Sequence, residues 1–464
     1  MILKPQIKRI LRQARGYWHN RQLVKSKSLR PVQDYVERGC ANNSKIILMG
    51  IDALMWRVLD SLLDQGKLPY LKSMIARGSC GTLKTLCPAL SPELWNTIST
   101  GKMPRKHGIT GFMATDHQTK KLVPYTSNMR KCKAIWEIFG DHNKKVGVVG
   151  WWNSWPAEPV EGSMVCGILG YKVRDIEKVK KRDHFVEFTR KSRLKASSFL
   201  QQTYPASLFN EIQPFIRPLT TVEDSHDFIR RIWENGDSLG ESEKESLKLL
   251  TSIYNIDRTY KDIAKHIYTK TRPDFLTFYI AGADIAGHKY WAYMEPDRFS
   301  TLLPQGKIRL YGNLIHDYYA YVDEIVGEFM RLADSDTTIA VVSDHGMSPD
   351  DRLLRRTKVN SARHFNEDGI FILMGPHIKE HNFVKDIVSV LDITPTLLRL
   401  MGLPLAADMD GYPIEDIFTP EFISKNPLRL IKTYDINRKY TNDPIESPVD
   451  DEIKERLKSL GYID

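Results

Sequence analysis

The stretch that decides the fold is Pro88-Ala89-Leu90-Ser91-Pro92-Glu93-Leu94-Trp95-Asn96-Thr97-Ile98-Ser99-Thr100-Gly101. It is typical of a loop that turns into a helix, because Ser91 is a favourable N-cap, Pro92 suits the first helical position and Gly101 suits a helix end. A hydroxyl at this place lies beside free backbone N–H groups and the positive end of the helix dipole, and both favour an anion such as phosphate. On this stretch alone, two interpretations stay open: Ser91 only caps the helix, or it is a reactive hydroxyl.

Short apolar runs elsewhere in the chain predict buried strands, at residues 45–50, 145–149, 275–280, 338–343 and 369–374. Helical patterns separate them, at 53–66 and 69–77 among others. Strands that alternate with helices predict an α/β fold with a mainly parallel, doubly wound sheet flanked by helices. With 464 residues and 42% hydrophobic side chains, the chain is long enough to bury a large core.

Composition divides the chain into regions. Residues 171–270 are rich in Lys, Arg, Glu and Ser and helical in pattern, so we predict a helical cap insertion over the sheet edge. The predicted catalytic core is formed by 41–170 together with 271–420. A basic N-terminal arm, 1–40, precedes this core, and a C-terminal tail, 421–464, follows it.

The arm holds most of the chain's charge. Residues 1–40 contain ten Lys and Arg against two acidic residues, which leaves +8 of the total +10 in this segment. The apolar side chains of 1–30 fall on one helical face, as expected either for peripheral contact with a membrane or protein or for an arm docked on its own domain. Because the body is nearly neutral, we expect no nucleic acid partner.

Targeting signals and disulfide patterns are missing from the sequence. The chain has no run of about 20 apolar residues that could span a membrane and no secretory signal. Its five cysteines are widely spaced without CxxC pairs, which is the usual pattern of a reducing interior. We therefore predict a cytoplasmic protein, with peripheral membrane attachment as an alternative and with the oligomeric state open.

Six Asp and His side chains follow or precede the predicted strands: Asp52, Asp284, His288, Asp344, His345 and His364. Sites in open parallel sheets form at the carboxyl ends of strands, so these residues stand where a site is expected. Carboxylates and imidazoles without cysteine suit divalent ions, Zn²⁺ above all. Two such ions would suit displacement at phosphorus with Ser91 as nucleophile, and no G-x-S-x-G elbow or P-loop offers another mechanism.

The ordered motifs of the chain resemble those of the alkaline phosphatase superfamily, in its type I phosphodiesterase/nucleotide pyrophosphatase branch. They are Ile51-Asp52; Ser91 to Gly101 with Pro104 and His107-Gly108-Ile109; Asp284 to His288; Asp344-His345-Gly346; His364 with Asp368-Gly369; and Asp392, Pro395 and Asp410-Gly411. This resemblance implies an alkaline-phosphatase-like fold. It also implies one metal held by Asp284, His288 and His364, a second held by Asp52, Asp344 and His345, and Ser91 as nucleophile and metal ligand.

One departure from the family pattern concerns the substrate. Nucleotide pyrophosphatases place an Asn shortly after the His-Gly-Ile motif, whereas this chain has Thr110-Gly111-Phe112. Several aromatic residues stand in or beside the expected site loops: Phe112, Trp151, Trp152, Trp155 and Trp291. An aromatic wall would accept the second ester group of a diester, so Phe112 and Trp291 become candidate substrate-binding residues, although aromatics of this kind are often ordinary core.

The sequence therefore predicts a metal-dependent hydrolase of phosphate esters, with phosphodiesters or nucleotide pyrophosphates as substrates. The same site acting on phosphonates or phosphomonoesters, or as a phosphotransferase, is the alternative. A non-catalytic protein that binds a membrane or partner is a third interpretation, which the intact set of ligands and hydroxyl disfavours.

Overall fold

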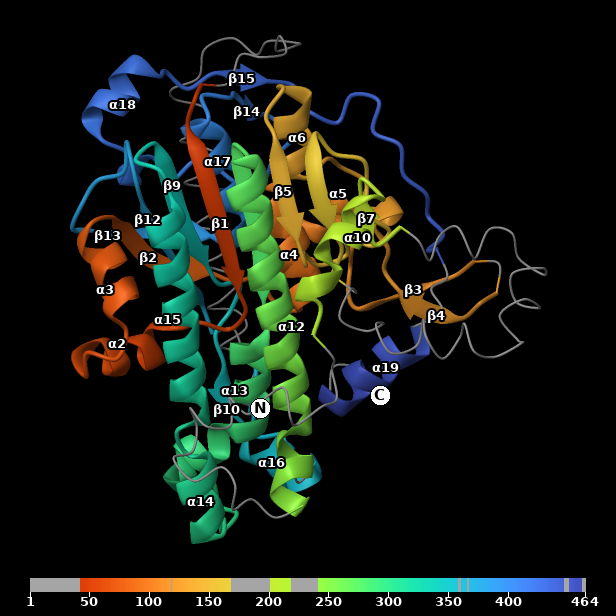
Figure 1. Cartoon of the computed structure of the whole chain (residues 1–464), viewed down its shortest axis with the longest axis vertical. Helices are drawn as coiled ribbons and strands as arrows, with labels where there is room; N and C mark the ends of the chain where they lie inside the picture. The colour runs from red at the N-terminus through yellow and green to blue at the C-terminus, as the bar shows by residue number, and fades with distance from the viewer. Residues whose placement is uncertain are drawn as a thin grey trace, which may run out of the picture.

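Short apolar strands rich in Ile, Val and Phe form the centre of the molecule as a sheet with helices on both faces (Figure 1). The computed structural model describes residues 42–117, 119–167, 201–217, 241–357, 360–364, 367–445 and 450–460. The predicted arm, 1–40, lies outside these residues.

Within the described residues the main sheet has nine strands, in the order β13-β2-β12-β9-β1-β8-β5-β6-β7. Their bounds are β1 Lys45–Ile51, β2 Ser79–Lys84, β5 Val146–Val149, β6 Gly162–Val165, β7 Thr203–Tyr204, β8 Phe275–Ile280, β9 Thr337–Val342, β12 Gly369–Met374 and β13 Asn382–Ser389. Three small two-stranded sheets pair β3 Met113–Thr115 with β4 Leu122–Pro124, β10 Ser348–Pro349 with β11 Ala362–Arg363, and β14 Leu405–Ala406 with β15 Leu430–Ile431. The mainly parallel, doubly wound sheet that the sequence predicts is confirmed.

Alternating side chains of β1 divide the core into two layers. Ile47 and Met49 face one buried cluster, while Ile46 and Leu48 face the other, because successive side chains of a strand point to opposite faces. The first layer is covered by α2 Trp56–Asp64, α3 Pro69–Ala76, α12 Glu241–Thr271, α13 Gly282–Met294 and α15 Leu314–Leu332. The second is covered by α4 Ser91–Thr100, α6 Ile135–Asp141, α17 Ile393–Leu400 and α18 Pro420–Lys425. The other α-helices of the described residues are α5 Pro104–His107, α10 Leu208–Ile212, α14 Gln305–Tyr311, α16 Asp351–Thr357 and the C-terminal α19 Asp450–Leu460.

Strand direction explains how distant residues reach one edge of the sheet. β1 runs parallel to both β8 and β9, so the loops after these three strands emerge at the same edge. β12 runs antiparallel to β9, so its amino end, which follows His364, lies at that edge too. A Cβ on Gly369, the first residue of β12, would lie 2.0 Å from the Ser343 carbonyl oxygen, so only glycine allows this close approach.

The region predicted as a cap insertion belongs to the sheet layers where it is described. Residues 241–270 form most of the long helix α12, which packs against β5 and β8 on the face of the sheet rather than over its edge. The reason is its apolar stripe, which includes Leu250, Ile253 and Ile267 and joins the core. Residues 203–204 add the strand β7 to the sheet.

The segment predicted as a C-terminal tail, 421–464, also packs onto the body over its described part. β15 pairs with β14, and α19 lies beside β4 (Figure 1). Among the described helices, none combines the length and apolar character that crossing a membrane requires.

Candidate active site

Ser91 is the first residue of α4, at the edge of the sheet where β1, β8 and β9 end. Leu90 occupies the N-cap position and Ser91 is already helical, so the interpretation of Ser91 as the helix cap is wrong. Its Oγ instead lies 3.4 Å from Nε2 of His345 and is buried. Pro92 follows at the second helical position, where its missing N–H leaves no helical hydrogen bond unmade.

Asp52, Asp344 and His345 come together behind the serine hydroxyl. His345 Nε2 lies 3.1 Å from Asp52 Oδ1 and 3.5 Å from Asp344 Oδ2. The loops that carry these residues are tied together by Ser343, whose Oγ accepts a 2.8 Å hydrogen bond from the Leu54 N–H. Donor atoms of the three side chains lie within 4.8 Å of one another, which is close enough to hold one metal ion.

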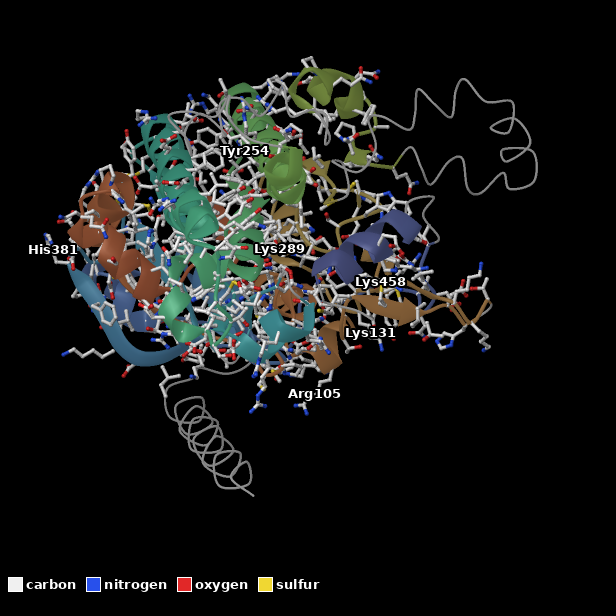
Figure 2. All side chains as sticks on the ribbon, turned by 90° about the horizontal axis from the view of Figure 1, so that it is seen from below. Arg105, Lys131, Tyr254, Lys289, His381 and Lys458 are labelled. Carbon is white, nitrogen blue, oxygen red and sulfur yellow. The ribbon has the colours of Figure 1, made fainter. Side chains whose placement is uncertain are left out.

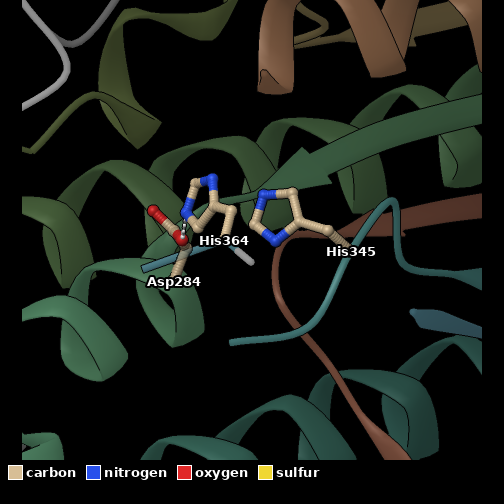
Figure 3. Close-up of side chains that lie close together, drawn as sticks. All are labelled: Asp284, His345 and His364. Atoms are coloured by element: carbon tan, nitrogen blue, oxygen red, sulfur yellow. Dashed lines mark hydrogen bonds and ion pairs between the residues drawn. The ribbon is translucent and has the colours of Figure 1, made fainter. Parts of the chain in front are cut away.

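Asp284, His288 and His364 form the neighbouring group. His364 Nε2 lies 2.8 Å from Asp284 Oδ1, and His288 Nε2 lies 3.5 Å from the same oxygen. Figure 3 shows the ring of His364 between Asp284 and His345, and the two imidazoles stack with centroids 3.7 Å apart. Asp284, His364 and His345 meet the same 4.8 Å criterion for a metal site, so the two groups adjoin through His345.

Backbone carbonyls fix the orientation of all three imidazoles. Nδ1 of His288 donates to the Ala362 carbonyl oxygen at 2.9 Å. Nδ1 of His364 donates to the Ala89 carbonyl oxygen at 3.2 Å, and Nδ1 of His345 donates to the Gly346 carbonyl oxygen at 3.1 Å. A carbonyl oxygen only accepts, so each Nδ1 carries a proton, and a ring that is neutral presents the lone pair of Nε2 to the cluster. Metal-ligating histidines commonly have this tautomer, with the other ring nitrogen donating to a carbonyl oxygen.

The electrostatics of the cluster fit a bound cation. The Nε2 atoms of His288 and His364 lie only 2.9 Å apart, so two lone pairs face each other when both rings are neutral. Both carboxylate oxygens of Asp344 and Oδ1 of Asp52 are buried without a hydrogen-bond partner in the described structure. Burial and the charge of Asp52 raise the pKa of Asp344 well above its ordinary value. Divalent ions would compensate these buried negative charges, so the residues present fit a metal centre.

In the group of Asp284, His288 and His364, neighbouring charges shift the pKa of the aspartate in the opposite direction to that of Asp344. Burial raises the pKa of Asp284, but His288 and His364 outweigh burial and hold it below the ordinary carboxyl value. Burial lowers the pKa of His288 to about 4, which keeps this ring neutral and able to ligate at neutral pH.

Two buried residues that the sequence did not single out support the cluster. The hydroxyl of Tyr279, in β8, donates a hydrogen bond to Asp52 Oδ2. Asp257, in α12, accepts from the backbone N–H groups of Ala281 at 3.0 Å and Gly282 at 2.9 Å, at the start of the helix that carries Asp284. In the sequence, Tyr279 could have been noticed only as a tyrosine, with a polar hydroxyl, next to the end of an apolar strand.

A cavity of about 150 Å³ opens beside the cluster and includes Asp52 and Asp284 in its wall. Several aromatic side chains line the cavity, including Phe112, Tyr125, Trp151, Trp152, Trp155 and Tyr279. Phe112 packs edge-on against Trp152, with ring centroids 5.9 Å apart. Among the described residues, no lysine or arginine lines this cavity.

Trp291 does not belong to this wall, which corrects the sequence prediction. It lies within α13 with 1% of its surface exposed and packs in the core. Its Nε1 donates to Glu295 Oε2 at 2.9 Å, and the Arg57 guanidinium lies 5.3 Å from its ring. Trp291 is an ordinary core residue because α13 turns this side chain toward α2 and away from the cavity.

Two lysines that follow α4 in sequence, Lys102 and Lys106, are paired with carboxylates. Lys102 is buried and pairs with Asp408 at 2.6 Å and with Asp435. Lys106 pairs with Asp410 at 2.8 Å. These lysines therefore stabilise the C-terminal end of α4, which is the end opposite Ser91.

These features define a class of α/β proteins in which a buried carboxylate–imidazole cluster and a helix-borne serine meet at one edge of a mainly parallel sheet. The chain belongs to the type I phosphodiesterase/nucleotide pyrophosphatase family, whose family model matches residues 46–395. The resemblance inferred from the motifs is thereby confirmed.

Individual curated relatives match only a short part of the chain. The chain is 29% identical to arylsulfatase K of Canis lupus familiaris over 122 residues and 28% identical to arylsulfatase K of Homo sapiens over 121 residues. Each match covers 24% of this chain and 22% of the relative, so the chain spans about a fifth of the length of these curated relatives.

Solved structures match over more of the chain. Murine ectonucleotide pyrophosphatase/phosphodiesterase 5 has a TM-score of 0.48 and 11% identity, over 81% of this chain and 100% of that chain. A mutant of the alkaline phosphatase PafA has a TM-score of 0.47 and 14% identity, over 83% of this chain and 100% of that chain.

Proposed function

We propose that the protein is a phosphodiesterase: a metal-dependent hydrolase that cleaves phosphodiesters or nucleotide pyrophosphates with Ser91 as nucleophile and two zinc ions as cofactors. The observation that carries this proposal is the convergence of Ser91 with six buried Asp and His side chains. The Ser91 hydroxyl lies 3.4 Å from a cluster ligand, His345, and serves no helix cap.

The two groups of ligands divide between two ions. Asp284, His288 and His364 would hold the first ion, and Asp52, Asp344 and His345 the second, with Ser91 beside them. When bound, divalent ions supply positive charge that lowers the pKa of a nearby hydroxyl and stabilises charge on a phosphoryl group. Carboxylate and imidazole ligands without thiolate suit zinc.

The chain's own groups bind and orient the substrate. The first N–H groups of α4 and the helix dipole favour a phosphoryl oxygen beside Ser91. Ser91 Oγ forms a bond to phosphorus as the bond to the leaving group breaks, and the hydroxyl proton goes to the departing alkoxide or phosphate. Water then cleaves the phosphoserine and restores the hydroxyl. The aromatic cavity holds the remaining ester group, with Phe112 as one of its walls.

Charge around the cavity favours diesters over monoesters. A monoester carries a second negative charge, which needs an extra cation or strong donor. Described residues of the cavity wall include neither lysine nor arginine, and Phe112 stands near the place where the family pattern has Asn.

We also propose a small-molecule substrate, a cytoplasmic location consistent with the cysteine pattern, and peripheral contact through residues 1–30.

A steady-state assay with zinc-loaded protein tests the proposal. We expect bis(p-nitrophenyl) phosphate to be cleaved with at least tenfold higher kcat/KM than p-nitrophenyl phosphate. Ser91→Ala should remove turnover by a factor of roughly 10³ or more because the nucleophile is lost, with zinc content unchanged, while Ser91→Thr retains a hydroxyl and part of the activity. Preference for the monoester would contradict the diester assignment, and full activity of Ser91→Ala would contradict the covalent route.

A further inference from the structure

The cavity beside the cluster is closed on one side by the C-terminal helix α19. Asp450, Ile453 and Leu457 of this helix line the same cavity as Asp52 and Asp284. The family match ends at residue 395, so this wall comes from a segment outside the part of the chain that defines the family.

The chain before α19 is anchored to the loop after β4. The Thr441 N–H donates to Asn128 O at 2.9 Å, and the Asn128 side chain donates to Asp443 O at 2.9 Å. The Ile445 N–H donates to Oγ1 of Thr126 at 3.1 Å, and Thr126 itself lines the cavity. These bonds bring the C-terminal segment to β4, against which α19 packs.

The side chains that α19 contributes are mainly apolar. Leu457 is buried with 6% of its surface exposed, and Ile453 is half-buried. Aromatic residues such as Trp152 and Tyr125 line the same cavity. Apolar side chains from one helix and aromatic rings from the body create a compartment that favours a flat or apolar group and disfavours a strongly hydrated one.

We propose that α19 is a specificity-determining wall of the active site, and that Leu457 and Ile453 contact the second, non-departing ester group of the substrate. This inference rests on the proposed phosphodiesterase function and narrows its substrates to diesters whose second group is apolar or aromatic. Leu457 and Ile453 act on selectivity between second groups, because they line the cavity from α19 and are not among the proposed metal ligands.

The experiment compares two diesters with the same leaving group, p-nitrophenol. In bis(p-nitrophenyl) phosphate the second group is aromatic, and in methyl p-nitrophenyl phosphate it is small. The measured quantity is the ratio of the two kcat/KM values, aromatic over methyl, in zinc-loaded full-length protein. Leu457→Ala removes apolar contact and Leu457→Trp fills the compartment, so both should lower this ratio roughly tenfold, mainly through KM for the aromatic diester.

Lys458→Ala is the matched control, because Lys458 is the next residue of α19 and is exposed to solvent (Figure 2). It should keep the wild-type ratio. Zinc content and Tm are measured for each variant, so a folding defect of Leu457→Ala is recognised and Leu457→Trp still decides the question.

The outcomes separate this inference from the proposed function. A ratio lowered by both Leu457 variants and kept by Lys458→Ala supports the inference. Ratios within twofold of wild type for both Leu457 variants, in protein that cleaves the diesters, overturn it alone. A wild-type protein that cleaves neither diester overturns the proposed function, and the role of α19 with it.

Discussion

At the scale of single residues, the site depends on side chains that hold the proposed ligands as well as on the ligands themselves. Asp52 is oriented by Tyr279, and each imidazole is oriented by a carbonyl oxygen. Burial and the neighbouring Asp52 charge raise the pKa of Tyr279 well above its usual value, so its hydroxyl keeps the proton that it donates. Loss of a hydrogen bond to a metal ligand commonly lowers metal affinity by about 10–100-fold.

We therefore predict that Tyr279→Phe weakens zinc binding about tenfold or more, because Asp52 loses its donor. The measurement is competition for zinc between the protein and a chromophoric chelator. Tyr319→Phe is the control, since its buried hydroxyl donates to the Ala53 carbonyl, next to Asp52, at 2.9 Å rather than to a proposed ligand. Equal zinc affinities of the two variants would contradict the positioning role of Tyr279.

At the scale of helices, two buried aspartates do the same structural work in different places. Asp257 accepts from two backbone N–H groups at the start of α13, which carries Asp284 and His288. Asp323 accepts from the N–H groups of Tyr70 at 3.2 Å and Leu71 at 2.7 Å, at the start of α3, which carries no site residue. Tyr318 also donates to Asp257 at 2.6 Å, so α12, α13 and α15 are joined at this point.

We predict that Asp257→Asn and Asp323→Asn each lower the free energy of unfolding by about 1–2 kcal/mol, because each weakens a charged helix cap. Only Asp257→Asn should also lower zinc affinity, since α13 positions ligands and α3 does not. Denaturant unfolding gives the first quantity and zinc titration of the metal-free protein gives the second. If Asp323→Asn lost as much zinc affinity as Asp257→Asn, the effect would be general destabilisation rather than positioning.

Elements that were predictable from the sequence are those with a strong local pattern. The strand runs before Asp52, Asp284 and Asp344 are continuous and apolar, and the structure has strands there. The strand β2 was not predicted because it reads Ser-Cys-Gly-Thr-Leu-Lys, without an apolar run. A Cβ on Gly81 of β2 would lie 2.7 Å from the nearest ring carbon of Phe371 in β12. Glycine is therefore required here by packing against a strand that is distant in the sequence.

At the scale of the whole molecule, the site residues could be predicted as a set, but their surroundings could not. Asp and His at strand ends are visible in the sequence, because parallel strands bring their carboxyl ends together. The support from Asp257, the wall formed by α19 and the burial of Trp291 depend on packing between segments far apart in the sequence or on the direction of one helix face. Local patterns carry no information on these contacts.

The measurement that most directly tests the central claim is elemental analysis of the purified full-length protein, alone and as ligand variants. The buried Asp and His cluster predicts about two divalent ions per chain, zinc foremost, and loss of activity when chelation removes them. His364→Ala should lower the metal content, while His117→Ala, on a loop away from the cluster, should keep it. Active protein without bound divalent ions, or equal metal content in the His364→Ala and His117→Ala variants, would contradict the account.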